Sequence, residues 1–193
     1  MSSQTREIQH ALIATMKEAA AAFRDAEIDF MLGGGPAGWA RGGPPTDHDV
    51  DFYVRQDDVE RALSALEATG MRVERPPEEW LFKAYDGPIL VDLIFCPASG
   101  PIGDEHFVRA TSMEVGAQTL VVASIDDILV AKLLALSEQE PNDQAVLELA
   151  RALREQVDWE FVRSRAADSP LARAFFTLVE ELGIVEPDRS AAA

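Results

Sequence analysis

The segment that most constrains the fold of this chain is residues 30–54, FMLGGGPAGWARGGPPTDHDVDFYV. A short apolar run ends in three glycines, and a loop of small residues then leads to Asp49 and Asp51 inside a second apolar run. A glycine turn of this kind can present bare backbone N–H groups to a phosphate. The two carboxylates, at positions i and i+2 of a predicted strand, project from one face about 6.6 Å apart along the chain. The segment therefore predicts a phosphate-binding turn beside a pair of cation ligands.

The length and composition indicate a soluble globular protein. With 193 residues, 47% of them apolar and 26% charged, we expect one domain, or one domain with a modest appendage. The longest apolar runs are too short to cross a bilayer, and the first ten residues lack the basic start and apolar centre of a signal peptide. We therefore expect a cytoplasmic protein with no membrane partner. Cys96 is the only cysteine, and we interpret it as a partly buried structural thiol.

The net charge of −17 disfavours indiscriminate nucleic-acid binding, because such binding depends on neutralising many phosphates. A local basic patch is still compatible with this charge. The arginines between residues 151 and 173 alternate with acidic residues, which indicates a solvated surface rather than an RNA-binding patch. Only three lysines are present, so the position of each is informative; they are Lys17, Lys83 and Lys132.

Hydrophobic periodicity and turn residues predict an α+β protein: a mixed sheet flanked by helices, with a C-terminal helical subdomain. We expect an α/β core with its N-terminal helix over residues 1–123, the helical subdomain over 124–186 and a frayed tail over 187–193. Asp86-Gly87 is the predicted turn of a hairpin. The predicted helices are 5–26, 36–41, 56–69, 125–136, 142–156, 159–167 and 170–183; the predicted strands are 28–32, 50–54, 71–74, 80–85, 88–95 and two short ones within 111–122.

Asp92 is the one charged residue in the apolar run 88–95, PILVDLIF. Burial of a lone carboxylate in a strand is costly unless the group is paired, hydrogen-bonded or metal-bound. If this strand lies beside the strand at 50–54, Asp49, Asp51 and Asp92 converge on one face. Three carboxylates form an oxygen-only site that suits Mg²⁺ or Mn²⁺. The plainer alternative is three strand-end or hairpin aspartates that face solvent.

Lys132 lies in the predicted helix 125–136, which is apolar on almost every side. Its ammonium group can either reach the solvent at the edge of the helix or neutralise a buried phosphate or aspartate, and we favour the second interpretation. Arg41, Thr46 and His48, in the loop between the glycines and the aspartates, are candidates to contact a triphosphate. Taken singly they are ordinary loop polar residues, and the glycines alone are equally compatible with a flexible turn.

The order of these elements resembles the DNA polymerase β-like nucleotidyltransferase superfamily. The resemblance rests on the glycine turn, the short helix, the Asp49-Val50-Asp51 strand and the later Asp92, and Lys132 extends it beyond residues 28–95. It is closest to small bacterial nucleotidyltransferases, which include AbiEii-type toxins and antibiotic-modifying enzymes. Two departures are visible: the turn is all glycine where the family often has serine, and Thr46 is displaced by one residue from its commoner position.

The resemblance implies a metal-dependent transfer of a nucleoside monophosphate from an NTP to an acceptor hydroxyl, with release of pyrophosphate. It implies Mg²⁺ or Mn²⁺ ligands at Asp49, Asp51 and Asp92, with Asp92 also a candidate general base. It implies that Lys132 stabilises the triphosphate during catalysis. Nucleotide-binding roles follow for a larger set: Gly33, Gly34, Gly35, Arg41, Thr46, His48 and Lys132.

The acceptor stays open at this point. It is either the 3′ end of a tRNA, as for the toxin members, which would imply an antitoxin protein as a partner, or a small hydroxylated molecule. The acidic net charge slightly favours a small or cationic acceptor. The alternative function is a non-catalytic module that binds a nucleotide or a partner protein on a degenerate nucleotidyltransferase fold.

Overall fold

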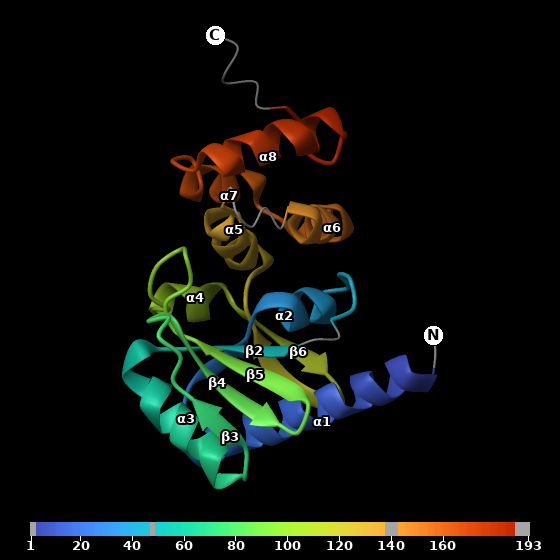
Figure 1. The fold of residues 1–193 in the computed structure, drawn as a ribbon. Helices are drawn as coiled ribbons and strands as arrows, with labels where there is room; N and C mark the ends of the chain where they lie inside the picture. Colours follow the sequence, from blue (N-terminus) through green and yellow to red (C-terminus); the bar gives the residue numbers. More distant parts are fainter. Residues whose placement is uncertain (1–2, 47–48, 138–142, 188–193) are drawn as a thin grey trace.

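The computed structural model describes residues 3–46, 49–137 and 143–187, and Figure 1 shows its fold. His48, one of the predicted nucleotide-binding residues, and most of the predicted frayed tail lie outside these ranges. In chain order the elements are α1 (Ser3–Asp25), β1 (Phe30–Leu32), α2 (Gly34–Ala40), β2 (Asp49–Val54), the 3₁₀ helix η1 (Gln56–Asp58), α3 (Val59–Ala68), β3 (Arg72–Glu74), β4 (Leu81–Asp86), β5 (Ile89–Ile94), α4 (Asp104–Arg109), β6 (Thr111–Val115), β7 (Gln118–Val122), α5 (Ile125–Ala135), α6 (Asp143–Leu153), the 3₁₀ helix η2 (Arg154–Gln156), α7 (Trp159–Arg165) and α8 (Pro170–Glu181).

The described strands form one seven-stranded sheet in the order β3-β4-β5-β2-β1-β7-β6. The pairs β2–β5 and β1–β7 are parallel, and the remaining neighbours are antiparallel. The sheet is therefore mixed and the protein is α+β, as the sequence predicts. Within the described ranges, no helix is both long enough and apolar enough to cross a membrane.

Helices cover both faces of the sheet (Figure 1). Helices α1 and α3 lie on one face, whereas α2, α4 and the C-terminal helices α5–α8 lie on the other. The α1 side holds an aromatic cluster in which the rings of Phe23, Phe30 and Phe52 lie 5.2–5.5 Å apart, centre to centre. Because side chains alternate along a strand, burial of Phe52 on this side sends Asp51 and Tyr53 to the α2 side.

The hairpin between β4 and β5 differs from the sequence prediction by one residue. Its turn is Gly87-Pro88, since Asp86 pairs with Ile89, and not Asp86-Gly87. Proline has no N–H to donate to a strand ladder, so it is better placed in the turn than at the start of β5. The shift matters for the site because it places Lys83 directly opposite Asp92.

Helix α4 is a feature that the sequence prediction missed. It has six residues, too few to show a helical period in the sequence. Its first turn carries Asp104 and Glu105 and its last turn carries Arg109, which complement the helix dipole and are the one local signal for it.

Candidate active site

The glycine turn between β1 and α2 wraps around Asp51. The Gly33 N–H donates to the Asp51 carbonyl oxygen at 2.8 Å, and the Gly35 N–H donates to Asp51 Oδ2 at 3.2 Å. Gly34 between them has φ +45°, in the left-handed region that favours glycine. The turn therefore orients a carboxylate in this structure, in addition to the phosphate-binding role predicted for its N–H groups.

A side chain at this turn would collide with its neighbours. A Cβ atom on Gly34 would lie 1.9 Å from Asp51 Oδ2, and one on Gly33 would lie 2.4 Å from the Tyr53 ring. Only glycine allows the backbone to approach β2 so closely.

Replacement of Gly34 by Ala should therefore displace the Asp51 carboxylate. We expect a loss of about 1–3 kcal/mol in unfolding free energy, from the left-handed backbone and the collision. Any activity that uses Asp51 should fall at least about 100-fold, since misplacement by about 1 Å costs that much. Denaturant unfolding and turnover assays measure the two effects.

Gly87→Ala is the matched control, because Gly87 has φ +55° and no atom within 4 Å of an added Cβ. It should lose stability through backbone strain alone and keep its activity. Equal loss of activity in both variants would show that the Gly34–Asp51 approach is not what the site requires.

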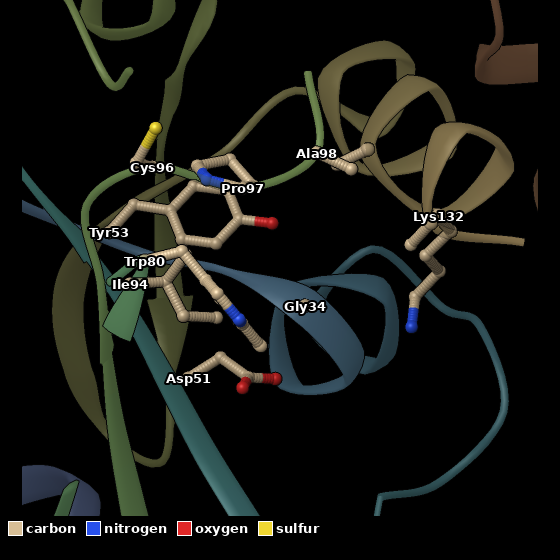
Figure 2. A pocket seen from close by; sticks show the side chains of 11 residues that line it. Gly34, Asp51, Tyr53, Trp80, Ile94, Cys96, Pro97, Ala98 and Lys132 are labelled. Atoms are coloured by element: carbon tan, nitrogen blue, oxygen red, sulfur yellow. The ribbon is translucent and has the colours of Figure 1, made fainter. Parts of the chain in front are cut away.

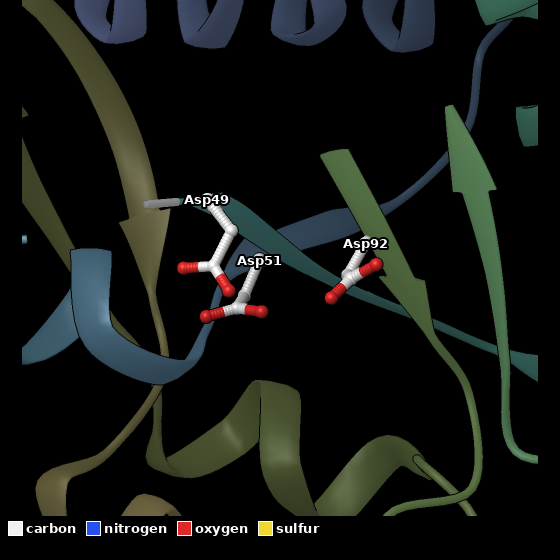
Figure 3. Close-up of side chains that lie close together, drawn as sticks. All are labelled: Asp49, Asp51 and Asp92. Carbon is white, nitrogen blue, oxygen red and sulfur yellow. The ribbon is translucent and has the colours of Figure 1, made fainter. Parts of the chain in front are cut away.

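Three carboxylates gather on the α2 side of the sheet, as the sequence predicts (Figure 3). The parallel register of β2 and β5 places Asp51 directly opposite Asp92, and Asp49 lies on the same face of β2. One carboxylate oxygen from each of the three lies within 4.8 Å of the others. Asp51 and Asp92 are both 8% exposed, so the cluster is largely withdrawn from solvent.

Burial and mutual repulsion make this cluster electrostatically unfavourable by itself. Burial raises the pKa of Asp51 to about 7, with Asp49 and Asp92 adding to the rise and Lys132 opposing it. Burial also raises the pKa of Asp92, although the ammonium group of Lys83 opposes the change. The pKa of the Tyr53 hydroxyl is raised as well, first by burial and then by the charge of Asp51. Positive charge placed among the carboxylates would relieve these costs.

The donor set fits a hard divalent cation. All three groups supply carboxylate oxygens, which suit Mg²⁺ or Mn²⁺, and no thiol or imidazole takes part in the cluster found among the described residues. The predicted ligands Asp49, Asp51 and Asp92 are therefore the residues of this protein that would hold such an ion.

A cavity of about 420 Å³ opens beside the carboxylates (Figure 2). Asp51 and Gly34 lie on one side of it, and Lys132 of α5 points toward the same space. Most of its remaining lining is apolar and includes Trp80, Ile94, Pro97 and Ala131. Lys132 therefore does not reach away from the site: it faces the space beside Asp51, which agrees with the second interpretation of the sequence.

The other described residues predicted to bind nucleotide, Thr46 and Arg41, lie around helix α2. Thr46 lies against the turn, with its Oγ1 3.3 Å from where a Cβ on Gly35 would lie. Arg41 is half-buried, and it donates from Nε to the Ala123 carbonyl oxygen at 2.9 Å and from Nη2 to that of Val122 at 3.1 Å. Its guanidinium group thus ties α2 to the end of β7. Cys96, interpreted as a structural thiol, is half-buried and lines the cavity.

Two ion pairs beside the site were not anticipated from the sequence. Lys83 Nζ lies 3.1 Å from Asp92 Oδ1. Arg109 of α4 binds both carboxylate oxygens of the buried Asp127 at 2.7–3.1 Å. At the start of α5, the Ser124 Oγ accepts from the Asp126 N–H at 3.0 Å and caps the helix. The Arg109–Asp127 pair anchors the helix that carries Lys132.

Comparison with solved structures identifies the fold of this chain. No protein-family model matches the sequence, and no curated protein matches it. The antibiotic-resistance factor ANT(2'')-Ia superposes with a TM-score of 0.63 at 16% identity, over 90% of this chain and 97% of that one. The lincosamide antibiotic adenylyltransferase LnuA gives 0.51 at 12% identity, over 70% and 94%. The chain has the nucleotidyltransferase fold.

The same fold extends to a further protein. An antigenic nucleotidyltransferase-like protein from Paracoccidioides brasiliensis superposes with a TM-score of 0.54 at 16% identity, over 100% of this chain and 93% of that one. This last likeness covers the whole chain, so it includes both the sheet and the C-terminal helices. At such low identity these likenesses establish the fold and leave the chemistry to the residues of the site.

Proposed function

We propose that this protein transfers a nucleoside monophosphate from an NTP to the hydroxyl group of a small molecule, in a reaction that requires Mg²⁺ or Mn²⁺. The observation that carries this proposal is the convergence of Asp49, Asp51 and Asp92 within 4.8 Å, beside a cavity that Lys132 enters from α5. On a nucleotidyltransferase fold, this combination supplies cation ligands and a phosphate partner at one place.

Each group of the site has a role in this proposal. A divalent cation held by the three carboxylates would neutralise the triphosphate and lower the pKa of the acceptor hydroxyl. Lys132 faces Asp51 across the cavity and is positioned to neutralise phosphate charge. The Gly35 N–H donates to Asp51 Oδ2 and so holds this ligand at the glycine turn, where phosphate oxygens bound to the same cation would lie beside the turn.

The reaction conserves atoms and charge as follows. The acceptor oxygen forms a bond to the α-phosphorus, and the bond from that phosphorus to the bridging oxygen of the β-phosphate breaks. Pyrophosphate leaves with the electron pair of the broken bond. The hydroxyl proton passes to Asp92, the carboxylate of the cluster that comes from the neighbouring strand β5. The protein contributes mainly positioning and electrostatic stabilisation.

A small acceptor is favoured over RNA. The net charge of −17 opposes the approach of a polyanion, and the cavity of about 420 Å³ lies in the size range of small-molecule sites. Two proteins of the same fold have been solved with such molecules, ANT(2'')-Ia with adenylyl-2''-tobramycin and LnuA with lincomycin. The tRNA acceptor, and with it an antitoxin partner, is the competing possibility that experiment must address.

The direct test is to incubate the protein with each of the four α-³²P-labelled NTPs and Mg²⁺ or Mn²⁺. One arm contains a panel of hydroxylated antibiotics and metabolites, and the other contains total tRNA. We expect label on a small molecule, abolished by EDTA, with the Asp49→Asn/Asp51→Asn double variant as the inactive control. Label on tRNA instead would replace the proposed acceptor and support the toxin function. Absence of label in every arm would support a non-catalytic binding module.

A further inference from the structure

Lys83 is a charged residue beside the carboxylate cluster to which the proposed reaction assigns no role. It lies on β4, directly opposite Asp92 of β5, and its Nζ contacts Asp92 Oδ1 at 3.1 Å. The Lys83 side chain is 25% exposed and that of Asp92 is 11% exposed, so the pair is better shielded from water than an ordinary surface ion pair.

The surrounding contacts direct Lys83 toward Asp92. Its cross-strand neighbour on the other side is Glu74 of β3. The carboxylate of Glu74 accepts from Arg72 Nη1 and from the Tyr85 hydroxyl, both at 3.4 Å. Glu74 thus has other partners, and the ion pair of Lys83 is with Asp92.

The contact takes one of the two carboxylate oxygens of Asp92. Its Oδ1 accepts from Lys83, while the carboxylate also borders the other two aspartates, with an oxygen of each of the three within 4.8 Å of the others. When all four groups are ionised, the three negative carboxylates and the positive Lys83 ammonium group leave two net negative charges. One divalent cation balances that charge. Lys83 therefore supplies positive charge that would otherwise have to come from metal.

We propose that Lys83 is a positioning residue that holds Asp92 by one oxygen and weakens the binding of divalent cations to the cluster in the absence of nucleotide. The ammonium group repels a cation at the carboxylates and competes with it for Asp92. Tight metal binding then depends on the phosphates of an NTP, so that metal and nucleotide enter the site together. This inference rests on the proposed function, because it takes the three carboxylates as cation ligands.

The test is calorimetric titration of the nucleotide-free protein with Mn²⁺. Lys83→Met should bind Mn²⁺ at least about tenfold more tightly than the wild type, because a positive charge beside the ligands has been removed. Lys83→Gln, a second uncharged variant, should behave alike if Lys83→Met does not fold. Lys83→Arg keeps the charge and should bind Mn²⁺ as the wild type does.

Two further variants isolate the mechanism. Lys17→Met removes the same charge from α1, on the opposite face of the sheet, and should leave Mn²⁺ affinity unchanged (Figure 1). The Lys83→Met/Asp92→Asn double variant should lose the gain, since the gain depends on the released carboxylate. Circular dichroism establishes that each variant is folded.

If Lys83→Met binds Mn²⁺ as tightly as the wild type or more weakly, the inference is overturned. The proposed function stays intact in that case if the protein still transfers the labelled nucleoside monophosphate to an acceptor. Tightening by Lys17→Met to the same extent would also overturn it, because the effect would then be one of net charge. Absence of Mn²⁺ binding in every variant, with no transfer of label, would remove this inference and the proposed function together.

Discussion

Replacing Asp51 by Asn is expected to lower kcat/KM for nucleotidyl transfer by at least about 10³-fold, because loss of a cation ligand removes several kcal/mol of charge stabilisation. The fold should survive. Asn has the same shape, can still accept from the Gly35 N–H and removes a buried charge that the metal-free protein tolerates poorly. Initial rates with a labelled NTP, together with the thermal unfolding curve, measure both parts of this expectation.

Asp57→Asn is the matched control. Asp57 is an exposed residue of η1, away from the cluster, so its variant should transfer label at the wild-type rate. Asp49→Asn should resemble Asp51→Asn. Wild-type turnover in the Asp51 variant, with the label still on the acceptor, would show that the three carboxylates are not the catalytic cation site.

The metal-free protein should become less stable as the pH rises from about 4 to about 8. The pKa of Asp51 is about 7 in the folded state and near 3.8 in the unfolded chain, so between these values the folded state holds a proton that the unfolded state has lost. Stability falls with pH wherever the folded state binds more protons. At about 1.4 kcal/mol per pKa unit, the difference between the two pKa values corresponds to about 4 kcal/mol of unfolding free energy. Denaturant titrations in EDTA across this range measure it.

Asp51→Asn provides the reference for this experiment because it lacks the titrating carboxylate. Relative to the wild type, Asp51→Asn should gain about 4 kcal/mol of unfolding free energy between pH 4 and pH 8. Mg²⁺ should stabilise the wild type at pH 8 more than at pH 5, where protons compete for the carboxylates. Parallel pH profiles for the two proteins would contradict the assignment of a raised pKa to Asp51.

The fold class and much of the candidate site were accessible from local pattern. Alternation in the segment 49–54 separates Val50 and Phe52 from Asp49 and Asp51, and the structure keeps that division. The lone charge in the run 88–95 marked Asp92 as a residue that needs a partner, and β5 lies beside β2 as that argument required. The short α4 was missed because six residues show no period, and its Arg109 finds its partner Asp127 eighteen positions away.

The register of the β4–β5 hairpin shows the limit of local pattern most clearly. A turn at Asp86-Gly87 would pair Lys83 with Leu90, whereas the observed turn at Gly87-Pro88 pairs it with Asp92. A shift of one residue in the turn moves each cross-strand partner by two positions, so the ion pair could not be deduced without the turn geometry.

The sequence by itself determined the order of the strands and of the helices other than the short α4, together with the glycine turn and the identity of the three aspartates, because periodicity, turn residues and the cost of burying charge act over a few neighbouring positions. Only the tertiary structure decided that Lys83 contacts Asp92, that Arg41 binds the carbonyl groups of β7 and its following residue, and that the Gly35 N–H bonds to Asp51. These contacts join residues from separate elements, and their partners are selected by strand register and by the packing of α2 on the sheet.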